Sequence, residues 1–134
     1  MSAIIQSCHE PKAELRAPTV LVAEDEILIR AMVAQHLRSA GFRIIEASNA
    51  HEAIDILTSG ESVDVLFTDV RMVGEKDGIR LAQWVERNRP AIRIVFGSGE
   101  TNLVDAVPGA RLFSKPYDLE DVERYVRGLV AGPA

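Results

Sequence analysis

Short apolar runs alternate along this chain with longer segments in which apolar residues recur every three or four positions. The short runs are Val20–Ala23, Arg43–Ala47, Val63–Thr68, Arg93–Phe96 and Arg111–Phe113. The first, third and fourth runs are apolar nearly throughout, which is typical of parallel strands that are covered on both faces. The pattern therefore predicts five strands.

Helical periodicity marks the longer segments. They are Ile27–Ala40, Asn49–Ser59, Gly78–Arg89 and Asp118–Val130. Asn49, with Glu52 three residues later, forms a capping-box pattern at the start of the second segment. Gly41 follows the first segment and supplies the left-handed position that often ends a helix, and Pro90 ends the third. Four helices are therefore predicted.

Strands that alternate with helices of this length predict an α/β fold, with right-handed crossovers and an open parallel sheet flanked by helices on both faces. The connection between the fourth and fifth strands has little helical character, because residues 100–108 include Asn102, Asp105 and Pro108, which have low helix propensity. We expect the fourth connecting helix to be short or absent there. Residues 1–17 are expected to form a tail, and residues 18–132 a single domain.

Composition narrows the class of protein. The 134 residues are 47% hydrophobic, which is enough for a folded core, and the net charge of −5 argues against nucleic-acid binding. No apolar stretch approaches the roughly 20 residues that span a bilayer, and the N-terminus lacks the layout of a signal peptide. A single cysteine, Cys8, cannot form an internal disulfide. We expect a cytoplasmic protein with neither a membrane nor a nucleic-acid partner.

Polar residues follow the apolar runs at the points where four of the strands end. They are Glu24, Asp25, Asp69, Ser98 and Lys115. The carboxyl ends of parallel strands meet at one edge of the sheet, where sites in open α/β folds lie. A single such residue would be explained by solubility or helix capping, but five from four separate segments point to a shared site.

Three carboxylates that converge repel one another, and at least one pKa should rise unless a cation balances the charge. Mg²⁺ prefers oxygen ligands and keeps positions for water and phosphate oxygens. Lys115 adds a positive charge, and Ser98 adds a hydroxyl, as needed to stabilise a phosphoryl group in transfer. Asp69 is the best-placed nucleophile, and its product would be an acyl phosphate. Glu26 is expected to favour the positive N-terminus of the next helix.

From about Thr19 to Val130 the chain resembles the receiver domain of two-component response regulators. The resemblance rests on four segments, VLVAEDE, LFTDVRM, FGSGE and FSKP. It implies a flavodoxin-like sheet with strand order 2-1-3-4-5 and a Mg²⁺ site. The metal ligands that it implies are Glu24, Asp25, Asp69 and the backbone carbonyl of Arg71.

The same resemblance assigns roles to the remaining residues. It implies that Asp69 is phosphorylated, that Ser98 is the switch hydroxyl, and that Lys115 contacts the phosphate. It also implies a cis peptide bond before Pro116. Two family positions differ here, since Leu112 replaces the usual aromatic residue three positions before the lysine and Val73 replaces a usual proline. The segment FGSGE, the short fourth helix and the missing aromatic residue are similar to those of single-domain receivers of alphaproteobacteria.

The implied function is that of a phosphoacceptor switch, not a conventional enzyme. A histidine kinase or a histidine phosphotransfer protein would supply the phosphoryl group, and the domain would catalyse only its own phosphorylation and dephosphorylation. Because the chain ends four residues after Val130, we expect no output domain. Action through binding an unknown downstream protein or through phosphate relay is then expected, from a monomer or a weak homodimer.

The sequence leaves two alternatives to this switch, of which the first is a Mg²⁺-dependent phosphatase-type enzyme. Dehalogenase-like phosphatases place an Asp-x-Asp motif on the first strand, whereas Glu24 and Asp25 are adjacent here, and the chain has no GxxxxGK[ST] nucleotide-binding loop. The other alternative is a receiver-shaped interaction module that no longer takes phosphate. The intact acids, together with Ser98 and Lys115, argue against that alternative.

Overall fold

The computed structural model describes residues 17–72, 77–99 and 109–131. Its strands are β1 (Thr19–Ala23), β2 (Arg43–Ala47), β3 (Val65–Asp69), β4 (Arg93–Ser98) and β5 (Arg111–Ser114). Its helices are α2 (Ile27–Ser39), α3 (Ala50–Thr58), α4 (Gly78–Asn88) and α5 (Leu119–Ala131). The five predicted strands and four predicted helices are therefore confirmed, each within a few residues of its expected ends.

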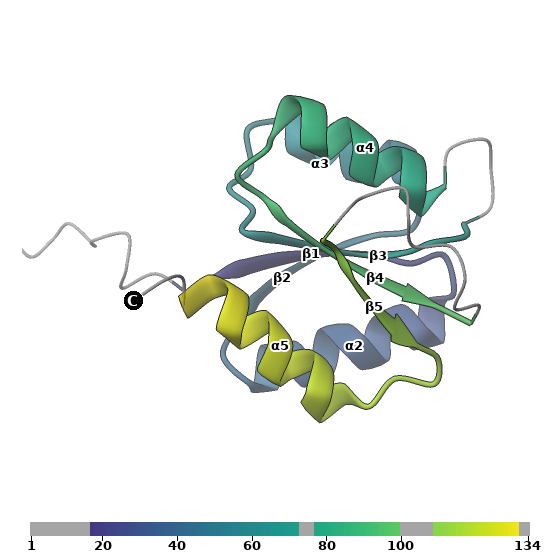
Figure 1. Cartoon of the computed structure of the whole chain (residues 1–134), viewed down its shortest axis with the longest axis vertical. Coiled ribbons are helices and arrows are strands. Elements are labelled where there is room, and N and C mark those ends of the chain that lie inside the picture. Colours follow the sequence, from purple (N-terminus) through teal and green to yellow (C-terminus); the bar gives the residue numbers. More distant parts are fainter. Residues whose placement is uncertain (1–16, 73–76, 100–108, 132–134) are drawn as a thin grey trace, which may run out of the picture.

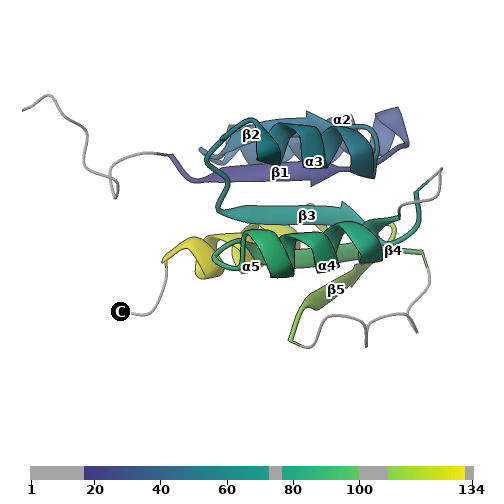
Figure 2. The same cartoon turned by 90° about the horizontal axis from the view of Figure 1, so that it is seen from above.

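All the strand pairs are parallel, and the sheet has the order β2-β1-β3-β4-β5, as predicted (Figure 2). The register sets neighbours at the carboxyl edge, where Asp69 lies opposite Gly97 and Ser98 lies opposite Ser114. These pairings bring the ends of β3, β4 and β5 together, so the residues that follow each strand share one rim.

Helices cover both faces of the sheet, with α2 and α5 on one face and α3 and α4 on the other (Figure 1). The strands are buried on both sides because alternate residues enter two separate cores. Val22 and Phe67 pack toward the α2 and α5 face, while Leu21 and Leu66 pack toward α3 and α4. This double covering accounts for the nearly continuous apolar runs in the sequence.

The predicted helix ends are also confirmed. Asn49 caps α3, because its side chain accepts a hydrogen bond of 2.8 Å from the Glu52 N–H. The Glu52 carboxylate accepts the N–H of Ser48, so the reciprocal bond reaches one residue further back than in a regular capping box. Gly41 has φ of 101°, the left-handed value expected for the glycine after a helix.

Two strand boundaries differ from the prediction. β3 begins at Val65 and not at Val63, and the side chain of Asp64 just before it accepts the Thr19 N–H. β4 extends to Ser98, two residues beyond the expected end. The predicted short or absent helix at residues 100–108, and nearly all of the predicted tail, lie outside the described residues. Within the described ranges, no helix combines the length and apolarity that crossing a membrane requires.

Candidate functional site

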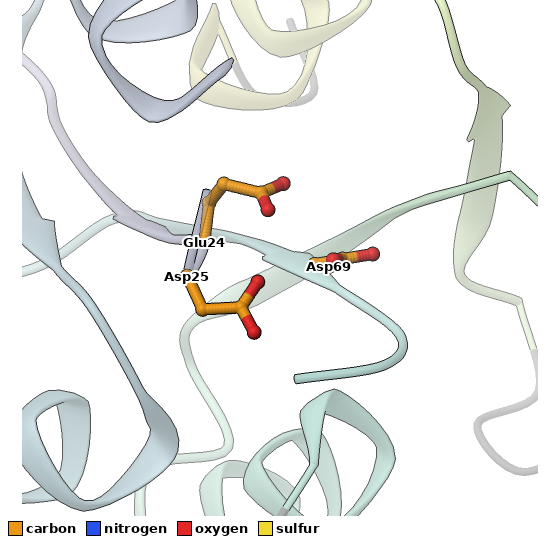
Figure 3. Close-up of side chains that lie close together, drawn as sticks. All are labelled: Glu24, Asp25 and Asp69. Carbon is orange, nitrogen blue, oxygen red and sulfur yellow. The ribbon is translucent and has the colours of Figure 1, made fainter. Parts of the chain in front are cut away.

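Three carboxylates meet at the carboxyl ends of β1 and β3. Glu24 and Asp25 directly follow β1, and Asp69 is the last residue of β3 (Figure 3). One oxygen from each side chain lies within 4.8 Å of the other two, and Glu24 and Asp69 are buried. The predicted convergence of these acids is confirmed. A compact set of carboxylate oxygens is the kind of donor set that a hard divalent cation prefers.

Lys115, the residue that follows β5, joins this cluster. Its Nζ lies 3.2 Å from Oε1 of Glu24 and 3.2 Å from Oδ2 of Asp69, and it is 3.5 Å from Oε1 of Glu26. The lysine backbone N–H donates to the Ser98 carbonyl over 2.9 Å, which continues the pairing of β5 with β4 past the strand end. The peptide bond to Pro116 is cis, as the resemblance implied. One ammonium group thus contacts three carboxylates from two neighbouring segments.

Burial and neighbouring charges shift the pKa values of three groups in the site. Burial raises the pKa of Glu24 to about 7, helped by the charge of Asp69, although the Glu26 N–H and Lys115 oppose the rise. Burial also raises the pKa of Asp69, again against Lys115. Although burial acts to lower it, the pKa of Lys115 lies above its usual value, since Asp69 and Glu24 stabilise the ammonium. The predicted rise in an acid's pKa is confirmed, with desolvation rather than repulsion as its main cause.

This pKa shift predicts how stability depends on pH in metal-free buffer. The folded chain holds the Glu24 proton up to about pH 7, whereas the unfolded chain releases it near pH 4.5, so ionisation in this window costs the folded state free energy. The free energy of unfolding should therefore fall as the pH rises through the window. Glu24→Gln removes this titration. Above pH 7 the free energy of unfolding of this variant should therefore exceed that of the wild type by on the order of 1–3 kcal/mol. Urea unfolding in EDTA measures the difference.

Glu52 provides the matched control for this pH series. Hydrogen bonds from Ser48 lower the pKa of this exposed glutamate, so its linkage has the opposite sign and acts at lower pH. The stability difference between wild type and Glu52→Gln should stay constant above about pH 5.5, where both states are ionised. If the free energy of unfolding changes with pH equally in the wild type and in Glu24→Gln between pH 5 and 7, Glu24 is not the group that titrates in this window.

The structure also locates the two remaining predicted site residues. Ser98 is the last residue of β4 and is buried, and it follows Gly97, the partner of Asp69 in the strand register. Arg71 lies two residues after Asp69, and its backbone donates a hydrogen bond to the Asp69 carboxylate. Both residues therefore lie at the rim with the acids. Their roles, and that of the Arg71 carbonyl as a metal ligand, remain predictions.

Arg30 is a supporting residue that the sequence analysis missed. Its Nη1 donates to the backbone carbonyl of Glu24 over 2.9 Å, and its Nε lies 3.2 Å from Oε1 of Glu46 on β2. The guanidinium thus ties the turn after β1 to α2 and to the neighbouring strand. A basic residue one turn into the first helix, close after an acid pair, was the only signal in the sequence.

Gly78 supports the site from the face of the sheet that α3 and α4 cover (Figure 1). As the first residue of α4, it donates its N–H to the Val70 carbonyl over 2.9 Å. A methyl group at this position would overlap the carbonyl oxygen of Asp69 and lie 2.8 Å from its carbonyl carbon and 2.9 Å from Oγ1 of Thr68. The backbone of Asp69 is therefore packed directly against the start of the helix, at a distance that only glycine permits.

Known proteins resemble this chain in sequence and fold. Residues 20–127 match the response regulator receiver domain family. The response regulator receiver protein CpdR of Brucella abortus is 32% identical over 108 residues, which cover 77% of this chain and 88% of that protein. The crystal structure of a response regulator receiver protein from Sinorhizobium medicae has a TM-score of 0.81 at 30% identity, covering 88% of this chain and 98% of that one.

A further similar structure is that of a complex with a ligand. The response regulator TrrA of Thermotoga maritima, in complex with Mg²⁺-BeF, has a TM-score of 0.76 at 23% identity and covers 84% of this chain and 98% of that one, which is a likeness of fold. Three other relatives are much longer than the chain, which spans only 23%, 28% and 12% of their lengths.

Proposed function

Because this chain belongs to the response regulator receiver family, we propose that it is a Mg²⁺-dependent phosphoacceptor switch in which Asp69 receives the phosphoryl group. Receiver domains are generally signalling domains and not conventional enzymes. The observation that carries the proposal is the contact between Asp69 and Lys115, 3.2 Å apart, within a cluster that also holds Glu24 and Asp25. A nucleophile, a cation and two further acids then stand at one edge of the sheet.

The donor set supports Mg²⁺ as the metal. Glu24, Asp25 and Asp69 offer only carboxylate oxygens, which are the ligands that a hard divalent cation prefers. We propose that these three residues and the backbone carbonyl of Arg71 hold the ion. When bound, Mg²⁺ supplies positive charge to phosphoryl oxygens during transfer.

The proposed reaction transfers a phosphoryl group from a donor histidine to Asp69. An oxygen of the Asp69 carboxylate attacks phosphorus, a P–O bond forms, and the P–N bond of the donor phosphohistidine breaks with its electron pair passing to the ring nitrogen. The ammonium of Lys115 stabilises negative charge on the moving group, and the hydroxyl of Ser98 donates to a phosphoryl oxygen. Hydrolysis of the resulting acyl phosphate by water restores Asp69 and releases inorganic phosphate.

The proposed partners follow from this reaction. A histidine kinase or a histidine phosphotransfer protein donates the phosphoryl group, or receives it in a relay. The signal then passes to a downstream protein through partner binding, from a cytoplasmic monomer or weak homodimer. Two relatives support the link to kinases, since one protein and one solved receiver domain carry the names of the sensor kinase CckA and the hybrid histidine kinase CckA.

The test of the proposed function is phosphoryl uptake from a small donor. Incubation with acetyl phosphate and Mg²⁺ should add one phosphoryl group per chain, measured by intact mass, and hydroxylamine should remove it because an acyl phosphate is formed. EDTA should reduce uptake to background. If neither acetyl phosphate nor a phosphorylated histidine donor labels the chain, the proposed function is wrong and the interaction-module alternative stands.

A further inference from the structure

Tyr117 lies next to the acid cluster, on the same face of the sheet as Asp69. It follows Lys115 by two residues, and its ring packs edge-on against Phe67, with 5.4 Å between centroids and 76° between planes. Phe67 is itself two residues before Asp69 on β3. The aromatic pair therefore fixes the ring between the core under α2 and α5 and the rim where the carboxylates meet.

The hydroxyl of Tyr117 is buried and has no hydrogen-bond partner among the described residues. The space for it exists because residue 97 is glycine, since a methyl group there would overlap the hydroxyl and lie 2.5 Å from the ring carbon that carries it. Gly97 is the residue of β4 that pairs with Asp69 in the strand register. The hydroxyl thus reaches the sheet beside the phosphoacceptor strand.

The carboxylates of the site act electrostatically on this hydroxyl. The pKa of Tyr117 is raised, first by burial and then by the carboxylates of Asp69, Glu24 and Glu26. These are the same three acids that the ammonium of Lys115 contacts. One three-residue segment therefore presents two donors to the cluster, of which the ammonium is already engaged and the phenol is not.

A buried donor without an acceptor is unfavourable, so an acceptor that arrives within reach gains a hydrogen bond with little further loss of hydration. Phosphorylation brings such acceptors, because it adds charged oxygens that bind donors strongly. We propose that Tyr117 is a positioning residue whose hydroxyl donates a hydrogen bond to the phosphorylated side chain of Asp69, so that phosphorylation draws the segment between β5 and α5 toward the site. This inference rests on the proposed function.

The position of Leu112 fits a role for Tyr117 on the other face of the sheet. The family's usual aromatic site on β5 holds a leucine here, and that leucine packs with Val70, Ala82 and Phe96 on the face of α4. Tyr117 packs on the opposite face, against residues under α2 and α5. A phosphate-dependent change in Tyr117 would therefore be transmitted to α5 and not to the face that contains Leu112.

The test uses beryllium fluoride with Mg²⁺ as the probe of the phosphorylated site. The apparent affinity for the probe, read from thermal stabilisation of the full chain, should be about 10-fold weaker in Tyr117→Phe than in the wild type. Tyr125→Phe is the matched control, because Tyr125 lies on α5 against Phe113 and away from the acids. Its affinity should change less than about twofold, a shift too small for a lost charged hydrogen bond.

A spectroscopic measurement separates positioning from simple packing. The chain has two tyrosines, so 3-fluorotyrosine labelling gives two ¹⁹F resonances, and Tyr125→Phe assigns them. The Tyr117 resonance should move when the probe and Mg²⁺ are added, while that of Tyr125 stays in place. If the hydroxyl had only a packing role, its removal in Tyr117→Phe would change the stability of the free and the bound states equally. The affinity for beryllium fluoride would then stay unchanged.

The outcomes separate the two proposals. If the wild type binds the probe but Tyr117→Phe binds it equally well and the Tyr117 resonance does not move, the inference about Tyr117 is overturned and the phosphoacceptor function stands. If the wild type neither binds the probe nor takes phosphate from acetyl phosphate, the proposed function fails and the inference fails with it.

Discussion

Asp69→Asn is expected to abolish phosphoryl uptake from acetyl phosphate. The amide keeps the shape of the side chain but has no carboxylate oxygen to form an acyl phosphate. The same change should raise the free energy of unfolding in metal-free buffer at pH 8, because burial raises the pKa of Asp69 and the ionised carboxylate is therefore costly in the folded state. Intact mass measures the loss of uptake, and urea unfolding in EDTA measures the gain in stability.

Asp64→Asn is the control for this variant. Asp64 lies just before the other end of β3, where its carboxylate accepts the N–H of Thr19 over 2.8 Å, and an amide oxygen can accept the same bond. Uptake should remain within about twofold of the wild type, because the change lies away from the site. Phosphorylation of Asp69→Asn at the wild-type level would place the phosphoacceptor elsewhere.

Gly78→Ala is expected to destabilise the chain by about 3 kcal/mol or more. The new methyl group would overlap the carbonyl oxygen of Asp69, and neither this backbone nor that of α4 can give way cheaply. Relief requires α4 to move from the end of β3, which disturbs the hydrogen bond from the Gly78 N–H to the Val70 carbonyl. Uptake should also slow by about 10-fold or more, because small displacements of a reacting group have large effects on rate.

Gly128→Ala tests whether this effect is specific to the position. Gly128 lies within α5, and no other atom in the described part of the chain comes near its missing side chain. Alanine there should raise the free energy of unfolding by about 0.5–1 kcal/mol, since glycine is a poor residue for a helix interior. A Gly78→Ala variant with wild-type stability and uptake would show that α4 is not held against Asp69.

The convergence of Glu24, Asp25 and Asp69 could be predicted because it depends only on topology. Parallel strands end at the same edge, and apolar runs mark where each strand ends. The pairing of β3 with both β1 and β4 then brings the acids together whatever the fine detail of packing. The same reasoning placed Lys115 and Ser98 at the rim.

Contacts that depend on the orientation of a side chain could not be predicted in this way. Arg30 reaches the Glu24 carbonyl only because of how α2 is rotated over the sheet, and helical periodicity identifies the buried face but not such a contact. The sequence predicts only that Glu26 favours the N-terminus of the first helix. In the structure Glu26 is the N-cap of α2 without a side-chain capping bond, and its carboxylate also lies near Lys115. The space for Tyr117 depends on Gly97, which lies 20 residues earlier on another strand.

The bridge made by Arg30 sets a limit on how this site could be transplanted. Copying the acids and the lysine onto another sheet would not reproduce the turn after β1, because that turn is held by a guanidinium on α2 that is itself braced by Glu46 on β2. The smallest portable unit therefore includes β2 and α2 along with the four strands whose ends carry the polar groups. A designer who wants this chemistry elsewhere has to move the whole sheet.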